Sequence, residues 1–138
     1  MSAEYPGAIT LPASAHTAPE AAAAIGVEVG AIVKSLVFLR GDVPVLVLCS
    51  GANTVDAAAL GLTKASAAVV RAATGQAIGG VAPYGHPAPL ETLVDEDLMT
   101  YDVVWSGAGR PEKVFPMSPV ELLRATNGTP ARVRVRSS

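Results

Sequence analysis

Two apolar, β-branched runs in the first half of the chain constrain the fold more than any other feature. They span residues 33–39 and 43–48, and only Arg40-Gly41-Asp42 separates them. A short spacer with a Gly-Asp pair between two such runs is typical of a β-hairpin. We therefore expect two antiparallel strands that are buried on at least one face.

A helix is predicted just before this hairpin. Thr17 is a natural N-cap, Pro19 falls in the first turn, and Glu20 follows three residues after Thr17, as in a capping box. The alanine-rich segment 21–25 then favours helix, and Gly26 favours its end.

The other expected elements are shorter and alternate in type. We predict strands at 8–11, 90–94 and 103–105, helices at 55–60, 67–73 and from Ser118 to about Ala125, one helical turn at 95–97, an exposed edge strand carrying Val133 and Val135, and a shaped loop over 75–89. About six or seven strands with about four helices form an α+β fold. The length of 138 residues fits one domain over 1–138.

Composition restricts the function. The net charge of −2 argues against a general nucleic-acid binder, so any RNA contact requires a local basic patch. Arg132, Arg134 and Arg136 would share one face of the last strand, where they would either meet a tRNA backbone or keep an exposed edge soluble. No apolar stretch is long enough for a membrane span and no leader peptide is apparent, so a cytoplasmic protein is expected.

Metal and thiol chemistry are not expected. His16 and His86 lie far apart without a Cys partner, which argues against a zinc site, and no cofactor motif is present. The single cysteine, Cys49, lies within an apolar run and reads as a buried small hydrophobe rather than a nucleophile. The acidic run 95–97 reads as a helix cap rather than as a general acid or base.

Two features suggest chemistry. Lys34 opens an otherwise apolar strand, where it either reaches to an edge or meets an anion. Gly79 and Gly80, followed by Pro83, form a stretch whose consecutive N–H groups can cradle an anion or a developing oxyanion.

Together with other segments, in order, these features resemble the YbaK/ProX family of aminoacyl-tRNA deacylases, which includes the editing insertion of bacterial prolyl-tRNA synthetases. The resemblance covers about Ala8 to Ala125. It is carried by Thr17-Ala18-Pro19-Glu20-Ala21-Ala22, Val33-Lys34-Ser35-Leu36-Val37-Phe38, Gly79-Gly80-Val81-Ala82-Pro83, Val104-Trp105-Ser106-Gly107-Ala108-Gly109, and Val114-Phe115 before Ser118-Pro119-Val120-Glu121-Leu122-Leu123.

The resemblance implies a mixed, mainly antiparallel sheet or partial barrel flanked by helices. It implies a trans-editing deacylase that removes Ala, Cys or Ser from tRNA, with tRNA for proline as the leading substrate. Catalysis would be substrate-assisted, through a ribose hydroxyl, without a metal. The implied partners are the acceptor end of aminoacyl-tRNA and, as an open point, a synthetase, but neither DNA nor a membrane. The implied catalytic residues are Lys34, Gly79 and Gly80, and the implied substrate-binding residues are Val81, Ala82, Pro83 and Ser106. We further expect Ile32, Leu48 and Ser50 to line the pocket. His86 is near enough to the loop to bind substrate, or else is a solvated turn residue ahead of Pro87.

One alternative remains open at this point. Ala82 stands where relatives of this family often carry serine. A non-catalytic module that binds a nucleotide or aminoacyl-tRNA and associates with a synthetase would also fit such a sequence.

Overall fold

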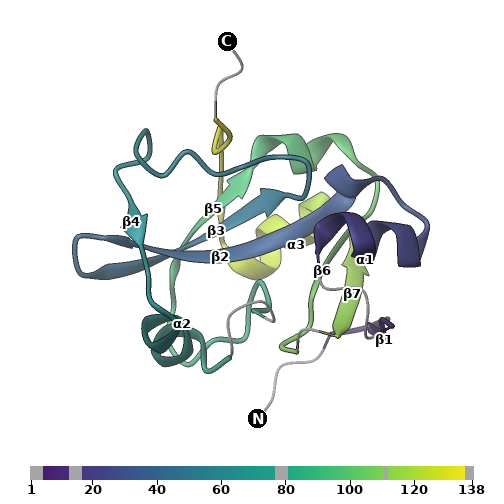
Figure 1. Ribbon diagram of the computed structural model, residues 1–138, viewed down its shortest axis with the longest axis horizontal. Coiled ribbons are helices and arrows are strands. Elements are labelled where there is room, and N and C mark those ends of the chain that lie inside the picture. The colour runs from purple at the N-terminus through teal and green to yellow at the C-terminus, as the bar shows by residue number, and fades with distance from the viewer. Residues whose placement is uncertain (1–4, 13–16, 77–80, 111, 136–138) are drawn as a thin grey trace.

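A computed structural model describes residues 5–12, 17–76, 81–110 and 112–135 (Figure 1). Its centre is the expected hairpin of β2 (Ile32–Arg40) and β3 (Val43–Ser50), which are antiparallel with Arg40 opposite Val43. Gly41 adopts a positive φ of 63° in the turn between them. A two-residue turn of this kind matches the right-handed twist of the strands that it joins.

Six further strands among the described residues extend the sheet. In spatial order the strands are β1-β7-β6-β2-β3-β5-β8, with β4 beside β2. The pairs β2–β6, β3–β5 and β5–β8 are parallel, and the other pairs among the described residues are antiparallel. The added strands are β1 (Ile9–Thr10), β4 (Thr63–Lys64), β5 (Glu91–Asp95), β6 (Val104–Gly107), β7 (Lys113–Met117) and β8 (Thr129–Ala131).

Three α-helices appear in the described part of the chain, at α1 (Ala18–Ile25), α2 (Ala67–Thr74) and α3 (Pro119–Thr126). Thr17 and Ser118 both form complete capping boxes with the glutamate three residues on. Two 3-10 turns, η1 (Val29–Ala31) and η2 (Glu96–Thr100), complete the set. None of the helices described could cross a lipid bilayer, since all are too short.

The helices cover the two faces of the sheet unequally. On one face, Val70 of α2 and Leu122 of α3 join a core that contains Val33 and Leu48. On the other face, α1 packs on Ile32 and its neighbours, while segment 55–62 and Val133 cover β3. In Figure 1, α1 lies beside β6 and β7, and α2 lies toward the other end of the β2–β3 hairpin. Alternate residues of β2 therefore face different cores.

Two predictions about local structure were wrong. Segment 55–60 is not a helix, because Val55 forms a β-bridge with Arg134 and the Asp56 N–H donates to the main-chain oxygen of Val133. The last strand, β8, ends at Ala131, before the expected edge strand, and Val133 is fully buried. Tertiary pairing with the C-terminal segment thus overrides helix propensity at 55–60.

Candidate functional site

The sheet has a gap along one edge of β2. On that side β2 pairs with β6 at Ile32 and Val33, and with β4 only at Phe38 and Leu39. No strand in the described part of the chain pairs with residues 34–37 on this side. An unpaired edge exposes main-chain N–H and C=O groups that can bind another chain or a ligand.

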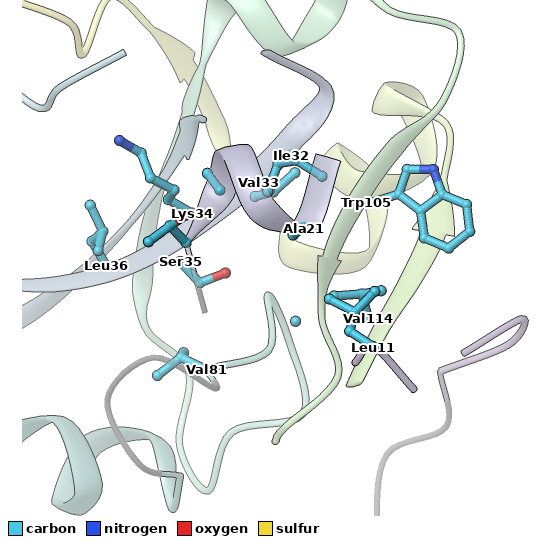
Figure 2. A pocket seen from close by; sticks show the side chains of 13 residues that line it. Leu11, Ala21, Ile32, Val33, Lys34, Ser35, Leu36, Val81, Trp105 and Val114 are labelled. Atoms are coloured by element: carbon cyan, nitrogen blue, oxygen red, sulfur yellow. The ribbon is translucent and has the colours of Figure 1, made fainter. Parts of the chain in front are cut away.

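A cavity of about 320 Å³ lies at this gap. Its walls come from α1, from β2, from the ends of β6 and β7, and from Val81 (Figure 2). The walls carry small apolar side chains such as Ala21, Val33 and Val81, with Trp105 at one side and Lys34 at the other. The cavity is therefore a small, mostly apolar pocket with a few polar groups, which is typical of a small-molecule site.

Lys34 lines the cavity with its aliphatic stem. Its ammonium group donates a hydrogen bond to the main-chain oxygen of Asn53, in the turn that follows β3. In Figure 2 the amine points away from Val81. The side-chain amide of Asn53 in turn donates to Asp95 at 2.9 Å and to Asp97 at 2.8 Å. A polar network thus holds the turn that binds Lys34.

Asp95 is the buried centre of that network. Its side chain is fully buried and accepts hydrogen bonds from the N–H of Ser50 and of Asp97, both at 3.0 Å. The second bond caps η2. The acidic run is thus a helix cap, as the sequence indicates, and the carboxylate of Asp95 is satisfied by donors rather than directed at the cavity.

Cys49 lies opposite Lys34 on β3 and is fully buried. Burial raises the pKa of its thiol to about 12, and the positive charge of Lys34 lowers this pKa only in part. A thiol with this pKa is neutral at physiological pH. Cys49 is a core residue, as predicted.

The loop after α2 is braced by side chains. Gln76 Oε1 accepts a hydrogen bond from the Ala82 N–H at 2.8 Å, and His86 Nε2 lies 2.7 Å from the Ala82 oxygen. Burial lowers the pKa of His86, although the hydrogen bond with the Ala82 oxygen raises it in part. These contacts fix Ala82, which is fully buried, next to Val81 in the cavity wall.

The residues expected at the site occupy different places. Ile32 and Val81 line the cavity with Lys34. Leu48 lies in the hydrophobic core, and Ser50 Oγ donates to the main-chain oxygen of Gly30 at 2.7 Å. Pro83 and His86 line a neighbouring hollow instead, Ser106 is buried within β6 beside the cavity, and Gly79 and Gly80 lie outside the described residues.

Sequence reasoning missed Ser35 as a site residue. Its hydroxyl is buried at the cavity and has no hydrogen-bond partner, a property that it shares, in the described part of the chain, with the Ser106 hydroxyl. Buried polar groups without a partner are rare, and they often mark a place for water or a ligand. The signal for Ser35 was its place next to Lys34 in the strand, on the opposite face.

The basic residues are divided between an ion-pair cluster and a cleft. Arg134 contacts both carboxylate oxygens of Asp97 at 3.0 Å and lies 3.6 Å from Glu96, and Arg136 falls outside the described residues. Arg110 and Lys113 line a second, more open cleft of about 910 Å³ beside the loop. No cluster of three metal-ligating side chains occurs among residues that the structure describes.

The chain was compared with protein families and with known proteins by sequence. The sequence model of the aminoacyl-tRNA editing domain matches residues 12–125. An uncharacterized protein of Bacillus subtilis, YwhH, is 33% identical over 116 residues, which cover 79% of this chain and 74% of YwhH.

Two solved structures are similar to this chain in both fold and sequence. A candidate trans-editing enzyme for prolyl-tRNA synthetase is 44% identical with a TM-score of 0.88, over 94% of this chain and 86% of that one. A hypothetical protein of solved structure is 30% identical with a TM-score of 0.81, over 93% of this chain and 90% of that one.

Proposed function

Because this chain belongs to the aminoacyl-tRNA editing domain family, we propose that it hydrolyses the ester bond between a mischarged small amino acid and tRNA, acting in trans. The amino acid would be Ala, Cys or Ser, and tRNA for proline is the first candidate because one similar structure is a candidate trans-editing enzyme for prolyl-tRNA synthetase. The partners are then the acceptor end of the tRNA and, in the cell, the synthetase whose errors it removes. We also propose a cytoplasmic location, in keeping with such a substrate.

The observation that carries this proposal is the small cavity at the β2 gap, with Lys34 at its edge. An aminoacyl ester is already labile, so positioning and stabilisation of the developing oxyanion are enough for rapid hydrolysis. The nucleophile would be water, activated with the help of a ribose hydroxyl of the substrate. Neither a side-chain nucleophile nor a metal is required by this chemistry.

The lining of the cavity suggests how selection by exclusion would work. Ala21, Val33 and Val81 border the cavity, and we propose that the part of it that receives the amino-acid side chain admits only a small one. A site that hydrolyses only what is small enough to enter is the second sieve of an editing system. Binding energy alone discriminates between side chains that differ by one methylene by only about 10- to 200-fold. Steric exclusion would supply the additional discrimination.

Lys34 would bind a phosphate near the terminal adenosine of the tRNA. A lysine ammonium is a strong, flexible partner for a phosphate. For this role the ammonium would exchange the main-chain oxygen of Asn53 for the phosphate. The basic cleft with Arg110 and Lys113 offers further contacts for the RNA backbone.

The test is the hydrolysis of a panel of mischarged tRNAs, including Ala-, Cys- and Ser-tRNA for proline, by the wild type, Lys34→Ala and Lys64→Ala. Lys64 lies exposed on β4, outside the cavity. Lys64→Ala removes the same charge as Lys34→Ala and is therefore the matched control. We expect hydrolysis by the wild type and by Lys64→Ala, and a loss of about 100-fold or more for Lys34→Ala. If the wild type binds these tRNAs without cleaving any of them, the chain is a binding module and the proposal is wrong.

A further inference from the structure

The unpaired edge of β2 has a definite polarity, which the register determines. In a strand, the N–H and C=O of one residue point to the same side, and those of the next residue point to the opposite side. Every second residue therefore bonds to the same neighbouring strand. The Ile32 oxygen accepts from the Gly51 N–H on the β3 side, whereas Thr63 Oγ1 donates to the Leu39 oxygen on the β4 side. Odd-numbered residues of β2 therefore direct their main-chain groups away from β3.

Within the gap at residues 34–37, Ser35 is the odd-numbered residue that lines the cavity. The pairings with β6 and β4 stop at Val33 and resume at Phe38, and the cavity is lined by Ser35. Its N–H and C=O thus face the open edge at the cavity. The described residues supply no strand partner for either group.

The Ser35 side chain adds a third polar group at the same place. Its hydroxyl is buried and lacks a hydrogen-bond partner. Figure 2 shows that this hydroxyl and the Lys34 amine point in opposite directions from β2, with the hydroxyl on the side of Val81. Three hydrogen-bonding groups of one residue therefore border a cavity that is otherwise mostly apolar.

We propose that Ser35 binds the aminoacyl group of the substrate as a one-residue extension of the sheet; this rests on the proposed function. The α-ammonium group donates to the Ser35 C=O, and the ester carbonyl accepts from the Ser35 N–H. An aminoacyl group carries these two groups on either side of one carbon, as a strand residue does, so both bonds form together as in an antiparallel pair. The Ser35 hydroxyl accepts a further hydrogen bond from the ammonium.

This arrangement separates the two ends of the substrate. Ser35 holds the amino acid on the Val81 side of β2, and Lys34 remains available to the phosphate on the other side. The Ser35 N–H donates to the ester carbonyl oxygen, where negative charge develops during hydrolysis. It would therefore act as one donor to the oxyanion. Recognition of the free amino group is then independent of the amino-acid side chain.

The experiment measures binding of two non-hydrolysable probes, 3′-(alanylamino)-3′-deoxyadenosine and the matching propionyl amide, which lacks the α-ammonium. For the wild type we expect the alanyl probe to bind about 10- to 100-fold more tightly, because a hydrogen bond to a charged group contributes this much. Ser35→Ala should weaken the alanyl probe about tenfold and leave the propionyl probe nearly unchanged. The control is Thr63→Ala, which removes a hydroxyl from β4 outside the cavity and should bind both probes as the wild type does.

Thermal unfolding without ligand separates a binding role from a structural one. Because the Ser35 hydroxyl has no partner to lose, Ser35→Ala should unfold at the same temperature as the wild type or higher. Equal affinity of the wild type for the two probes would overturn the inference, as would a Ser35→Ala variant with unchanged affinity and a lowered unfolding temperature. If the wild type hydrolyses mischarged tRNA but does not distinguish the probes, the inference fails and the proposed function stands. If it hydrolyses none of the panel, the proposed function fails, and the inference with it.

Discussion

The ammonium group of Lys34 donates a hydrogen bond to the main-chain oxygen of Asn53, which lies in the turn after the neighbouring strand. The amide of the same Asn53 is bound to Asp95 and Asp97. One turn thus connects the cavity with a buried carboxylate and with the C-terminal segment. The position of Lys34 depends on residues far from it in sequence.

Asn53→Ala should lower the free energy of unfolding by about 1–3 kcal/mol, because the buried carboxylate of Asp95 loses one of its donors. Urea denaturation measures this change. The control is Thr54→Ala, an exposed neighbour in the same turn that should remain near the wild type. Equal stability of the two variants would show that the network around Asp95 does not depend on Asn53.

Arg134→Ala should destabilise the protein by about 1 kcal/mol or less, because its ion pair with Asp97 is half-exposed and partly screened by solvent. The difference from the wild type should shrink in 1 M salt, where charges are screened over about 3 Å. Arg132→Ala, an exposed neighbour on the same segment, is the control for loss of charge. A difference that persists in full at high salt would mean that Arg134 stabilises by packing rather than by charge.

The elements with local signals could be predicted from the sequence. The hairpin and the three α-helices carry their own turns and caps, as at Gly41, Thr17 and Ser118. Strand β7 was missed as a separate strand, because Pro116 interrupts its pattern and its partners β1 and β6 are distant or short. Segment 55–60 was misassigned because its partner, Val133, follows more than seventy residues later.

The site residues also differ in how far the sequence reveals them. Lys34 stood out because a charged residue in an apolar strand needs an explanation. Ser35 did not, because its importance depends on the gap between β6 and β4, and the sequence does not show which strands flank β2. A serine in a strand is unremarkable until its hydroxyl is found without a partner. Such information comes from topology rather than from composition.

Cys49 should resist alkylation in the native protein. Its thiol is fully buried with a pKa of about 12, so almost no thiolate is present at pH 8. Iodoacetamide labelling at pH 8, followed by mass spectrometry, should be slow without denaturant and complete in urea. Rapid native labelling would contradict this, since it would require an accessible thiolate.

The raised pKa of Cys49 also has a consequence at alkaline pH. The unfolded thiol ionises near its ordinary pKa of 9.0, whereas burial raises the pKa of the folded thiol to about 12. The unfolded state is therefore favoured progressively as the pH rises from 9 toward 12. The free energy of unfolding of Cys49→Ala should therefore fall less between pH 8 and pH 10.5 than that of the wild type. Urea denaturation of both proteins at each pH measures this difference.

His86 should make the protein less stable in mild acid. Burial lowers its pKa in the folded state below the usual value of 6.5, so the unfolded state binds a proton first as the pH falls. The stability that the neutral ring contributes is present above pH 6.5 and is lost as the pH falls through the folded pKa. Neutral His86 can still donate from Nε2 to the Ala82 oxygen, and this bond holds the loop at the cavity wall.

The measurement is thermal unfolding of the wild type and His86→Gln at pH 7.5 and pH 5.5. Glutamine does not titrate and can also donate a hydrogen bond, so this variant should show a smaller drop in unfolding temperature between the two pH values. Carboxylates that titrate below pH 5 contribute equally to both proteins and cancel in the comparison. An equal drop in the two proteins would mean that the His86 ring is protonated as readily in the folded state as in the unfolded one, and that burial at this loop does not favour its neutral form.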